Sequence, residues 1–165
     1  MKKLLLFSIV IGTLGLMIAC GEPQKETPVD EPVYVDLGLP SGTLWKDKNE
    51  SGQYKFQDAL KKFGDNLPYR YQMLELIDTN LCKWEWEGGS YKVTGPNGNF
   101  ITLPAEGYAD CNGDFQNVGY YGGYWSSEQY VMTFLREREY AVKYCKRERL
   151  CNSLSVRLVK YSEED

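Results

Sequence analysis

Apolar and polar residues alternate along several short segments of the chain, and helical spacing interrupts this alternation twice. Alternation over 34–39 predicts one strand, and residues 43–45 begin a second short strand. Apolar residues at helical spacing over 56–63 predict an amphipathic helix that Gly64 ends. A second helix is expected after residue 68, with these apolar positions on one side: Met73, Leu76, Ile77 and Leu81.

The period changes to two after residue 82. Residues 83–87, 90–94 and 99–103 predict three strands of a meander, because Gly-Gly and Pro-Asn-Gly turns separate them. Residues 140–144 and 153–159 predict two more strands. Two early helices with most strands after them predict an α+β fold with a largely antiparallel sheet.

The N-terminal segment has the layout of an export signal. Two lysines precede an apolar stretch over 4–18, which at 15 residues is short for a membrane span of about 18 or more. The run Leu-Met-Ile-Ala-Cys that ends at Cys20 resembles a bacterial lipobox. This resemblance implies that residues 1–19 are removed and that Cys20 carries the lipid anchor. A plain secretory signal or a signal anchor is the alternative.

Charge divides the rest of the chain into three parts. Residues 20–32 are rich in proline and acidic residues, and they have too little apolar surface to offset the entropy of ordering, so we expect a solvated tether. The tail 162–165 is also acidic. Residues 33–161, the expected single domain, hold 16 basic and 16 acidic side chains, so the formal charge of −4 does not arise from the domain.

Composition excludes several kinds of chemistry. The 165 residues include no histidine, which excludes a Ser-His-Asp or Cys-His nucleophile and any site in which histidine binds zinc or haem. No pair of carboxylates is selected by its spacing for glycoside hydrolysis. We therefore expect no catalytic activity, no cofactor and no nucleic-acid partner.

Several longer motifs carry a family resemblance. They are YVDLGLPSGTLW at 34–45, LP at 67–68 with LELI at 74–77, CKWEW at 82–86, YKVTGPNGN at 91–99, LPAEGY at 103–108, YWSS at 124–127 and SVRLV at 155–159. In this order they resemble the Fibrobacter succinogenes major paralogous domain, which is common in lipoproteins of the Bacteroidetes. The resemblance implies a fold related to C-type lectins, with adjacent N- and C-terminal strands and two helices packed on a twisted sheet. Residues 128–152 match the family loosely, and lectin-like folds usually place their ligand surface there.

Four cysteines remain after lipidation, and they leave three interpretations open. Cys145 and Cys151 bracket five residues between two predicted strands, which favours a disulfide there and leaves Cys82 to pair with Cys111. Free buried thiols are the second interpretation. A metal or catalytic role is the third, and it is disfavoured because no C-x-x-C knuckle is present.

An aromatic cluster and a basic segment are the candidate ligand-binding features. Tyrosines offer flat apolar faces with a polar edge, and arginines pair with anionic groups. For the tyrosines, core packing is the alternative, and Trp125 is expected in the core. For the basic segment 136–149, a solvated hairpin with local ion pairs is the alternative. The candidates are Tyr120, Tyr121, Tyr124, Tyr130, Arg136, Arg138, Arg147 and Arg149.

The pattern Asp110-x-Asn112-x-Asp114 matches the first part of a calcium-binding loop but not the rest of it. An EF-hand loop requires glycine next and glutamate at the twelfth position, where this chain has Phe115 and Tyr121. We expect a simple turn and no metal site.

These observations together predict a non-catalytic binding module for a glycan or a protein, and the ligand is expected to meet the surface formed by residues 115–152. Its lipid anchor would hold it in the bacterial envelope, at the outer membrane in preference to the inner. A structural subunit of a surface appendage or envelope complex is the alternative function, and a hydrolase or modifying enzyme is the least favoured. The sequence predicts neither the oligomeric state nor the side of the membrane on which the domain lies.

Overall fold

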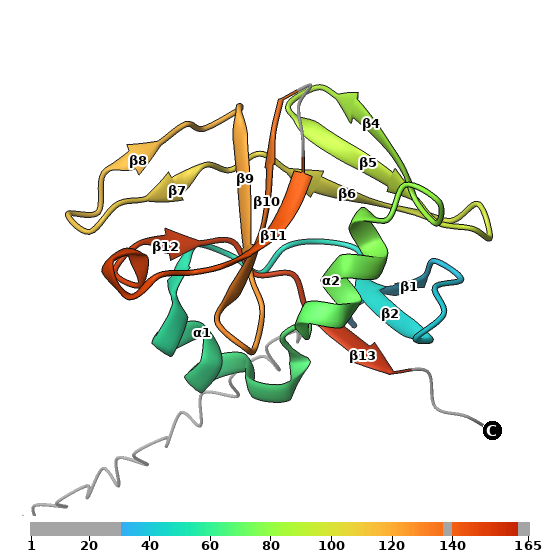
Figure 1. Ribbon diagram of the computed structural model, residues 1–165, viewed down its shortest axis with the longest axis horizontal. Coiled ribbons are helices and arrows are strands. Elements are labelled where there is room, and N and C mark those ends of the chain that lie inside the picture. The colour runs from blue at the N-terminus through green and yellow to red at the C-terminus, as the bar shows by residue number, and fades with distance from the viewer. Residues whose placement is uncertain (1–30, 137–139, 162–165) are drawn as a thin grey trace, which may run out of the picture. The chain divides into compact units, whose positions relative to one another are not determined.

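The computed structural model describes residues 31–136 and 140–161, which lie in one compact unit, Glu31–Asp165. These residues form two short α-helices and thirteen strands in four antiparallel sheets, which confirms the α+β class (Figure 1). Several predicted features lie outside the described residues: the signal peptide 1–19, Cys20, most of the tether 20–32, Arg138 and the tail 162–165.

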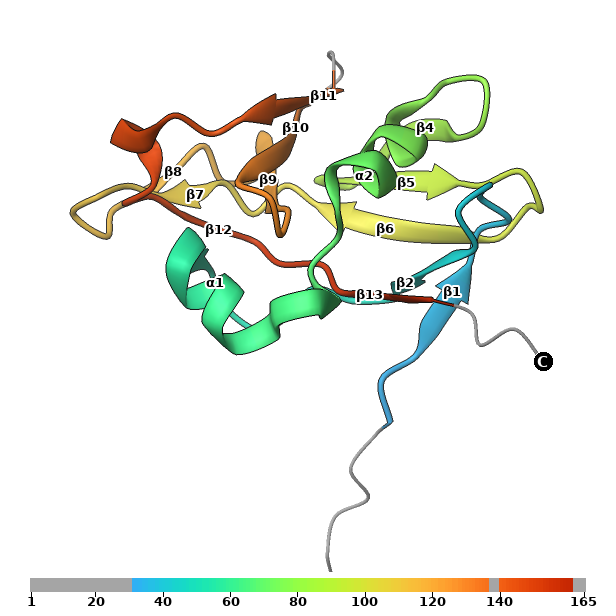
Figure 2. The same ribbon diagram turned by 60° about the horizontal axis from the view of Figure 1, so that its bottom comes forward.

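The N- and C-terminal strands belong to one sheet. Strand β2 (Thr43–Lys46) lies between β1 (Tyr34–Asp36) and β13 (Val159–Tyr161) and pairs antiparallel with both (Figure 2). The terminal strands therefore share a sheet, but the expectation that they are adjacent is wrong, because β2 lies between them. A tight turn brings β1 and β2 together, because the backbone N–H of Gly42 donates to the carbonyl of Leu39 and folds β2 back onto β1.

The predicted strand over 153–159 is divided in two. Its first part is β12 (Ser153–Leu154), which pairs with β3 (Tyr54–Lys55) and β7 (Tyr108–Ala109). Its last residue begins β13 in the other sheet. The residues between cross from one sheet to the other, and the carbonyl of Val156 accepts a hydrogen bond from a loop.

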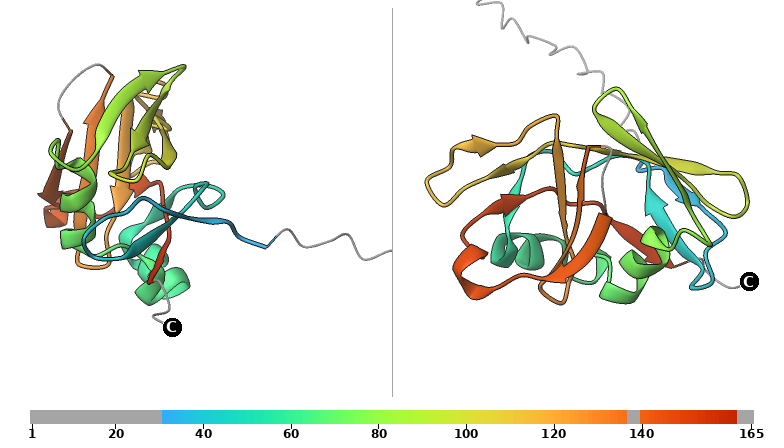
Figure 3. Two further views of the ribbon diagram at one scale, coloured as in Figure 1. Left: turned by 90° about the vertical axis from the view of Figure 1, so that its right-hand side faces the viewer. Right: turned by 45° about the horizontal axis from the view of Figure 1, so that its top comes forward.

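The predicted meander is confirmed. Strands β4 (Lys83–Glu87), β5 (Ser90–Thr94) and β6 (Phe100–Pro104) form a three-stranded antiparallel sheet. The meander and the hairpin of β7 with β8 (Phe115–Gln116) extend in opposite directions from the middle of the unit (Figure 3).

Both predicted helices are present, and the second is shorter than expected. Helix α1 (Phe56–Phe63) ends at Gly64, whose φ of 50° lies in the left-handed region that favours glycine. Helix α2 (Arg70–Ile77) ends before Leu81, because the Asp78 carbonyl accepts the backbone N–H groups of Leu81 and Cys82 in a turn. A short 3-10 helix, η1 (Gly64–Asn66), links the two.

The fourth sheet separates two hydrophobic clusters. It consists of β9 (Tyr121–Trp125), β10 (Tyr130–Leu135) and β11 (Tyr140–Tyr144), of which the sequence predicted only β11. The first cluster contains buried side chains of α2, and the second contains buried side chains of α1. Trp125 lies in the second cluster with no exposed surface, which confirms its predicted place in the core.

Candidate functional site

The residues of β10 alternate between the first core cluster and the opposite face of the sheet. Met132 and Phe134 lie in the first cluster, so Val131, Thr133 and Leu135 face the other way. The register brings residues of the neighbouring strands to this second face. Its pairs are Val131 with Lys143, Thr133 with Ala141 and Gly123, and Leu135 with Tyr121.

Two adjoining hollows on this face form the candidate site, which we call the sheet–loop pocket. The first hollow has a volume of about 630 Å³ and the second about 550 Å³, which is within the usual range for small-ligand sites. Four residues line both hollows and therefore define the pocket: Tyr121, Thr133, Lys143 and Arg149.

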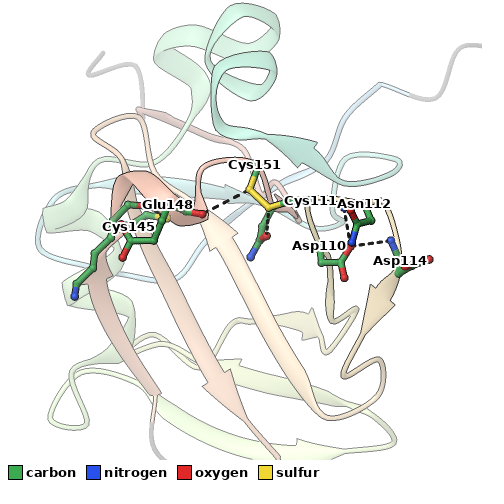
Figure 4. Close-up of a disulfide and its surroundings, with 9 residues drawn as sticks. Asp110, Cys111, Asn112, Asp114, Cys145, Glu148 and Cys151 are labelled. Atoms are coloured by element: carbon green, nitrogen blue, oxygen red, sulfur yellow. Dashed lines mark hydrogen bonds between the residues drawn. A yellow bond between two sulfur atoms is a disulfide. The ribbon is translucent and has the colours of Figure 1, made fainter.

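One wall of the pocket is the loop between β11 and β12. This loop contains the short 3-10 helix η2 (Arg147–Arg149), of which Arg149 lines both hollows and Arg147 lines neither. A disulfide between Cys111 and Cys151 joins the loop to the turn of the β7–β8 hairpin (Figure 4). Their Cα atoms are 4.9 Å apart, a usual distance for a disulfide.

The observed disulfide corrects the pairing that the sequence favoured. Cys151 bonds to Cys111, whereas Cys82 and Cys145 are buried free thiols. The two nearest cysteines in the sequence do not pair because Cys145 lies in the second core cluster, while Cys151 lies beside the hairpin turn. Burial raises the pKa of Cys82 to about 11 and also raises that of Cys145. Both groups are therefore neutral thiols at pH 7.

Tyr121 is the aromatic residue that both hollows share. Its ring contacts the ring of Tyr108 edge-on, with centroids 5.7 Å apart. Burial raises the pKa of Tyr121 to about 12, and the charge of nearby Arg149 partly opposes this shift. Within the described part of the chain the Tyr121 hydroxyl has no hydrogen-bond partner, so it remains available to a ligand.

Three basic side chains that line the pocket form no ion pair with the described residues. The described residues form three ion pairs, and all lie elsewhere: Lys46–Glu50, Lys48–Asp47 and Lys83–Glu85. Lys143, Lys146 and Arg149 are exposed, and they line the pocket without such a partner. Glu137, Arg138 and Glu139 lie outside the described residues, so the interpretation of this segment as a hairpin of local ion pairs stays a prediction.

The pocket unites only two of the predicted ligand-binding residues, Tyr121 and Arg149. The prediction that Tyr124 binds ligand is wrong, because its side chain is fully buried and its hydroxyl donates to the carbonyl of Pro104. The remaining described candidates line neither hollow: Tyr120, Tyr130, Arg136 and Arg147. Tyr130 instead contacts the guanidinium of Arg70, 5.1 Å from the centre of its ring.

Sequence reasoning missed several residues of the pocket. The sequence identifies Lys143 only as part of the basic segment. In β11, side chains alternate between the two faces of the sheet, so Lys143 lies on the face away from the first cluster, which its neighbour Val142 contacts. The polar side chains in the second hollow carry no motif in the sequence, because the fold brings them together from separate segments. They are Tyr108, Asn117, Thr133, Tyr144 and Asn152.

The pattern over 110–114 forms the expected turn. One carboxylate oxygen of Asp110 accepts the backbone N–H groups of Asn112 and Asp114, at 2.9 and 3.1 Å. These hydrogen bonds lower the pKa of Asp110. The described residues contain no group of three or more side chains suited to hold a metal ion.

Comparisons with protein-family models, curated proteins and solved structures give no significant match to this chain. Among the described residues, no helix is both long enough and apolar enough to cross a membrane.

Proposed function

We propose that this protein is a lipid-anchored binding module of the bacterial cell envelope, which recognises a glycan or a protein through the sheet–loop pocket. One observation carries the proposal: the pocket places a half-buried tyrosine, Tyr121, beside cations that have no ion-pair partner among the described residues. Aromatic faces next to charged groups are typical of recognition surfaces. The four residues that line both hollows also lie within 115–152, the segment that the sequence favoured for the ligand.

We also propose that the domain belongs to the Fibrobacter succinogenes major paralogous domain family and has a C-type-lectin-like fold. The observed features that support this are two helices packed on antiparallel sheets and a sheet shared by both terminal strands. We propose that a lipid on Cys20 anchors the domain to the membrane, and the lipobox-like sequence before Cys20 supports this. Replacement of Cys20 by serine is expected to abolish lipid labelling and membrane association in a bacterial host.

The binding function is tested by a glycan array and a surface pull-down with the full chain in detergent micelles. We expect Tyr121→Ala to lose the captured ligand and Tyr120→Ala to retain it. The two residues are neighbours of the same type, but only Tyr121 lines the pocket, and Tyr120 is 41% exposed outside it. Capture that survives in Tyr121→Ala would show that ligand binds elsewhere.

An assembly role is the second candidate, and the β7–β8 hairpin favours it. Strand β8 is at the edge of its sheet, and Phe115 and Val118 are 67% and 64% exposed. An edge strand with apolar side chains is a typical site for pairing with another chain. Sedimentation of the wild-type chain as a monomer at all concentrations would exclude self-assembly, whereas oligomers that Phe115→Asp disrupts would support it.

A further inference from the structure

We infer that the first hollow of the sheet–loop pocket binds the carboxylate of an acidic sugar unit, with Arg149 and Lys143 as its cationic partners. This inference rests on the proposed binding function and names the class of its ligand.

The charges that line the two hollows differ. Of the described residues that line the first hollow, Lys143 and Arg149 are charged, and none is acidic. The second hollow adds one cation, Lys146, and one carboxylate, Glu148, whose charges cancel. Among the described residues, only the second hollow therefore contains a carboxylate that would repel an anionic ligand. An anionic group is therefore favoured in the first hollow, where a guanidinium and an ammonium can donate charge-assisted hydrogen bonds to one carboxylate.

The neutral side chains favour a sugar over an acidic peptide. The second hollow contains two asparagines, a threonine and three tyrosines, which suit a ring that carries several hydroxyl groups. Asn117 has a φ of 55°, and no hydrogen bond to its side chain is found within the described residues. The amide of Asn117 and the hydroxyl of Tyr121 are thus available to bind hydroxyl groups. Carboxylates of a peptide would use the two cations and leave these groups unused.

The arrangement assigns a role to each wall of the pocket. The ring of Tyr121 provides an apolar face at the junction of the hollows, where the apolar side of a sugar ring can pack. The loop over 145–152 holds Arg149, and the disulfide to Cys111 restricts the movement of that loop. Restriction before binding lowers the entropy that binding costs.

A matched pair of ligands tests the inference. Methyl β-D-glucuronide and methyl β-D-glucoside differ only in the group at C6, a carboxylate in the first and a hydroxymethyl in the second. We expect the full chain in micelles to bind the glucuronide at least about tenfold more tightly in an NMR titration, because one charge-assisted pair accounts for such a ratio. The advantage should fall as NaCl rises from about 50 to about 500 mM, because salt screens exposed charges.

A matched pair of variants tests the residues. Arg149→Gln should remove the preference for the glucuronide, and Arg147→Gln should retain it, since both arginines are exposed in η2 but only Arg149 lines the pocket. Thermal unfolding of both variants should match that of the wild type, because neither arginine is buried.

Three outcomes would overturn the inference. Equal binding of glucuronide and glucoside would show that the first hollow does not recognise a carboxylate, and it would leave the proposed binding function intact. Binding of hexaglutamate with the same dependence on Arg149 would show that the pocket recognises an acidic protein. Absence of binding to all three probes would exclude an acidic sugar, and the Tyr121→Ala pull-down would still report on the binding function independently.

Discussion

Gly122 and Phe134 face each other across the β9–β10 pair, and the phenyl ring occupies the space that a side chain at residue 122 would need. A Cβ atom at Gly122 would lie 2.1 Å from the Phe134 ring. Gly123 has a different neighbour, because its Cβ atom would lie 2.8 Å from the ring and hydroxyl of Tyr121. The two adjacent glycines therefore admit one core ring and one pocket ring on opposite faces of β9.

Alanine at these two positions is expected to have different effects. Gly122→Ala forces a buried ring out of place, so we expect the free energy of unfolding to fall by about 1–3 kcal/mol. Gly123→Ala displaces the far end of a half-buried tyrosine, so its cost in stability should be smaller and its effect on ligand capture larger. Urea unfolding and the pull-down measure the two effects separately. Equal losses of stability in both variants would contradict this account of β9.

The disulfide should be detectable as a single bond. A non-reducing mass measurement is expected to show a loss of two hydrogen atoms relative to the reduced chain, because Cys82 and Cys145 remain thiols. Cys111→Ser with Cys151→Ser should lower the free energy of unfolding by about 2–4 kcal/mol, since the bond closes a loop with a sequence separation of 40. A loss of four hydrogen atoms, or disulfide-linked peptides that contain Cys145, would show a different pairing.

Arg157 should be among the most sensitive residues for stability. It is 1% exposed, and its guanidinium donates to four acceptors: Asn49 Oδ1 and the carbonyls of Lys46, Asp47 and Thr102. A lysine cannot reach all four, so Arg157→Lys should leave buried carbonyls without donors and cost about 3–5 kcal/mol. Urea unfolding checks this, with exposed Arg147→Lys as the control, for which no change is expected.

Stability should decline in alkaline solution. Burial raises the pKa of Cys82 from its ordinary value of 9.0 to about 11, so the folded state holds this proton more tightly than the unfolded state. The contribution of Cys82 is therefore complete below pH 9 and is lost as the pH rises through about 11. Cys82→Ala should show a shallower decline over this range in urea unfolding. An identical decline in wild type and variant would assign the effect to other groups, such as Tyr121.

The sequence predicted best those elements whose side chains alternate or repeat on a single face. Helix α1 and the meander β4–β6 meet this condition, and Gly64 marks a boundary by its backbone conformation. Strands β9 and β10 were missed because residues on both of their faces are buried, which removes the alternation. The glycines of β9 leave room for the rings of Phe134 and Tyr121.

The candidate site was predictable only as a segment. Tyr121 and Arg149 lie within 115–152, the segment that the sequence favours. The sequence does not distinguish them from Tyr120 and Arg147, which are one and two positions away in the chain and line neither hollow. Tyr124 was misassigned for the same reason, since its hydroxyl is satisfied inside the core. Pairing of cysteines depends on distances in space, and these follow from the fold rather than from spacing.

Along β10 and β11, residues of the first cluster alternate with residues on the pocket face, where Val131 also packs in the second cluster. Thr133, Ala141 and Lys143 face the pocket, while Met132, Phe134 and Val142 face the first cluster. Exchange of these three pocket residues would change the lining of the pocket without removing a side chain from either cluster. A one-residue deletion within either strand would instead transfer core side chains to the pocket. The binding specificity that we propose for the pocket is thus open to substitution at these positions, whereas an insertion or deletion in either strand would disrupt the core.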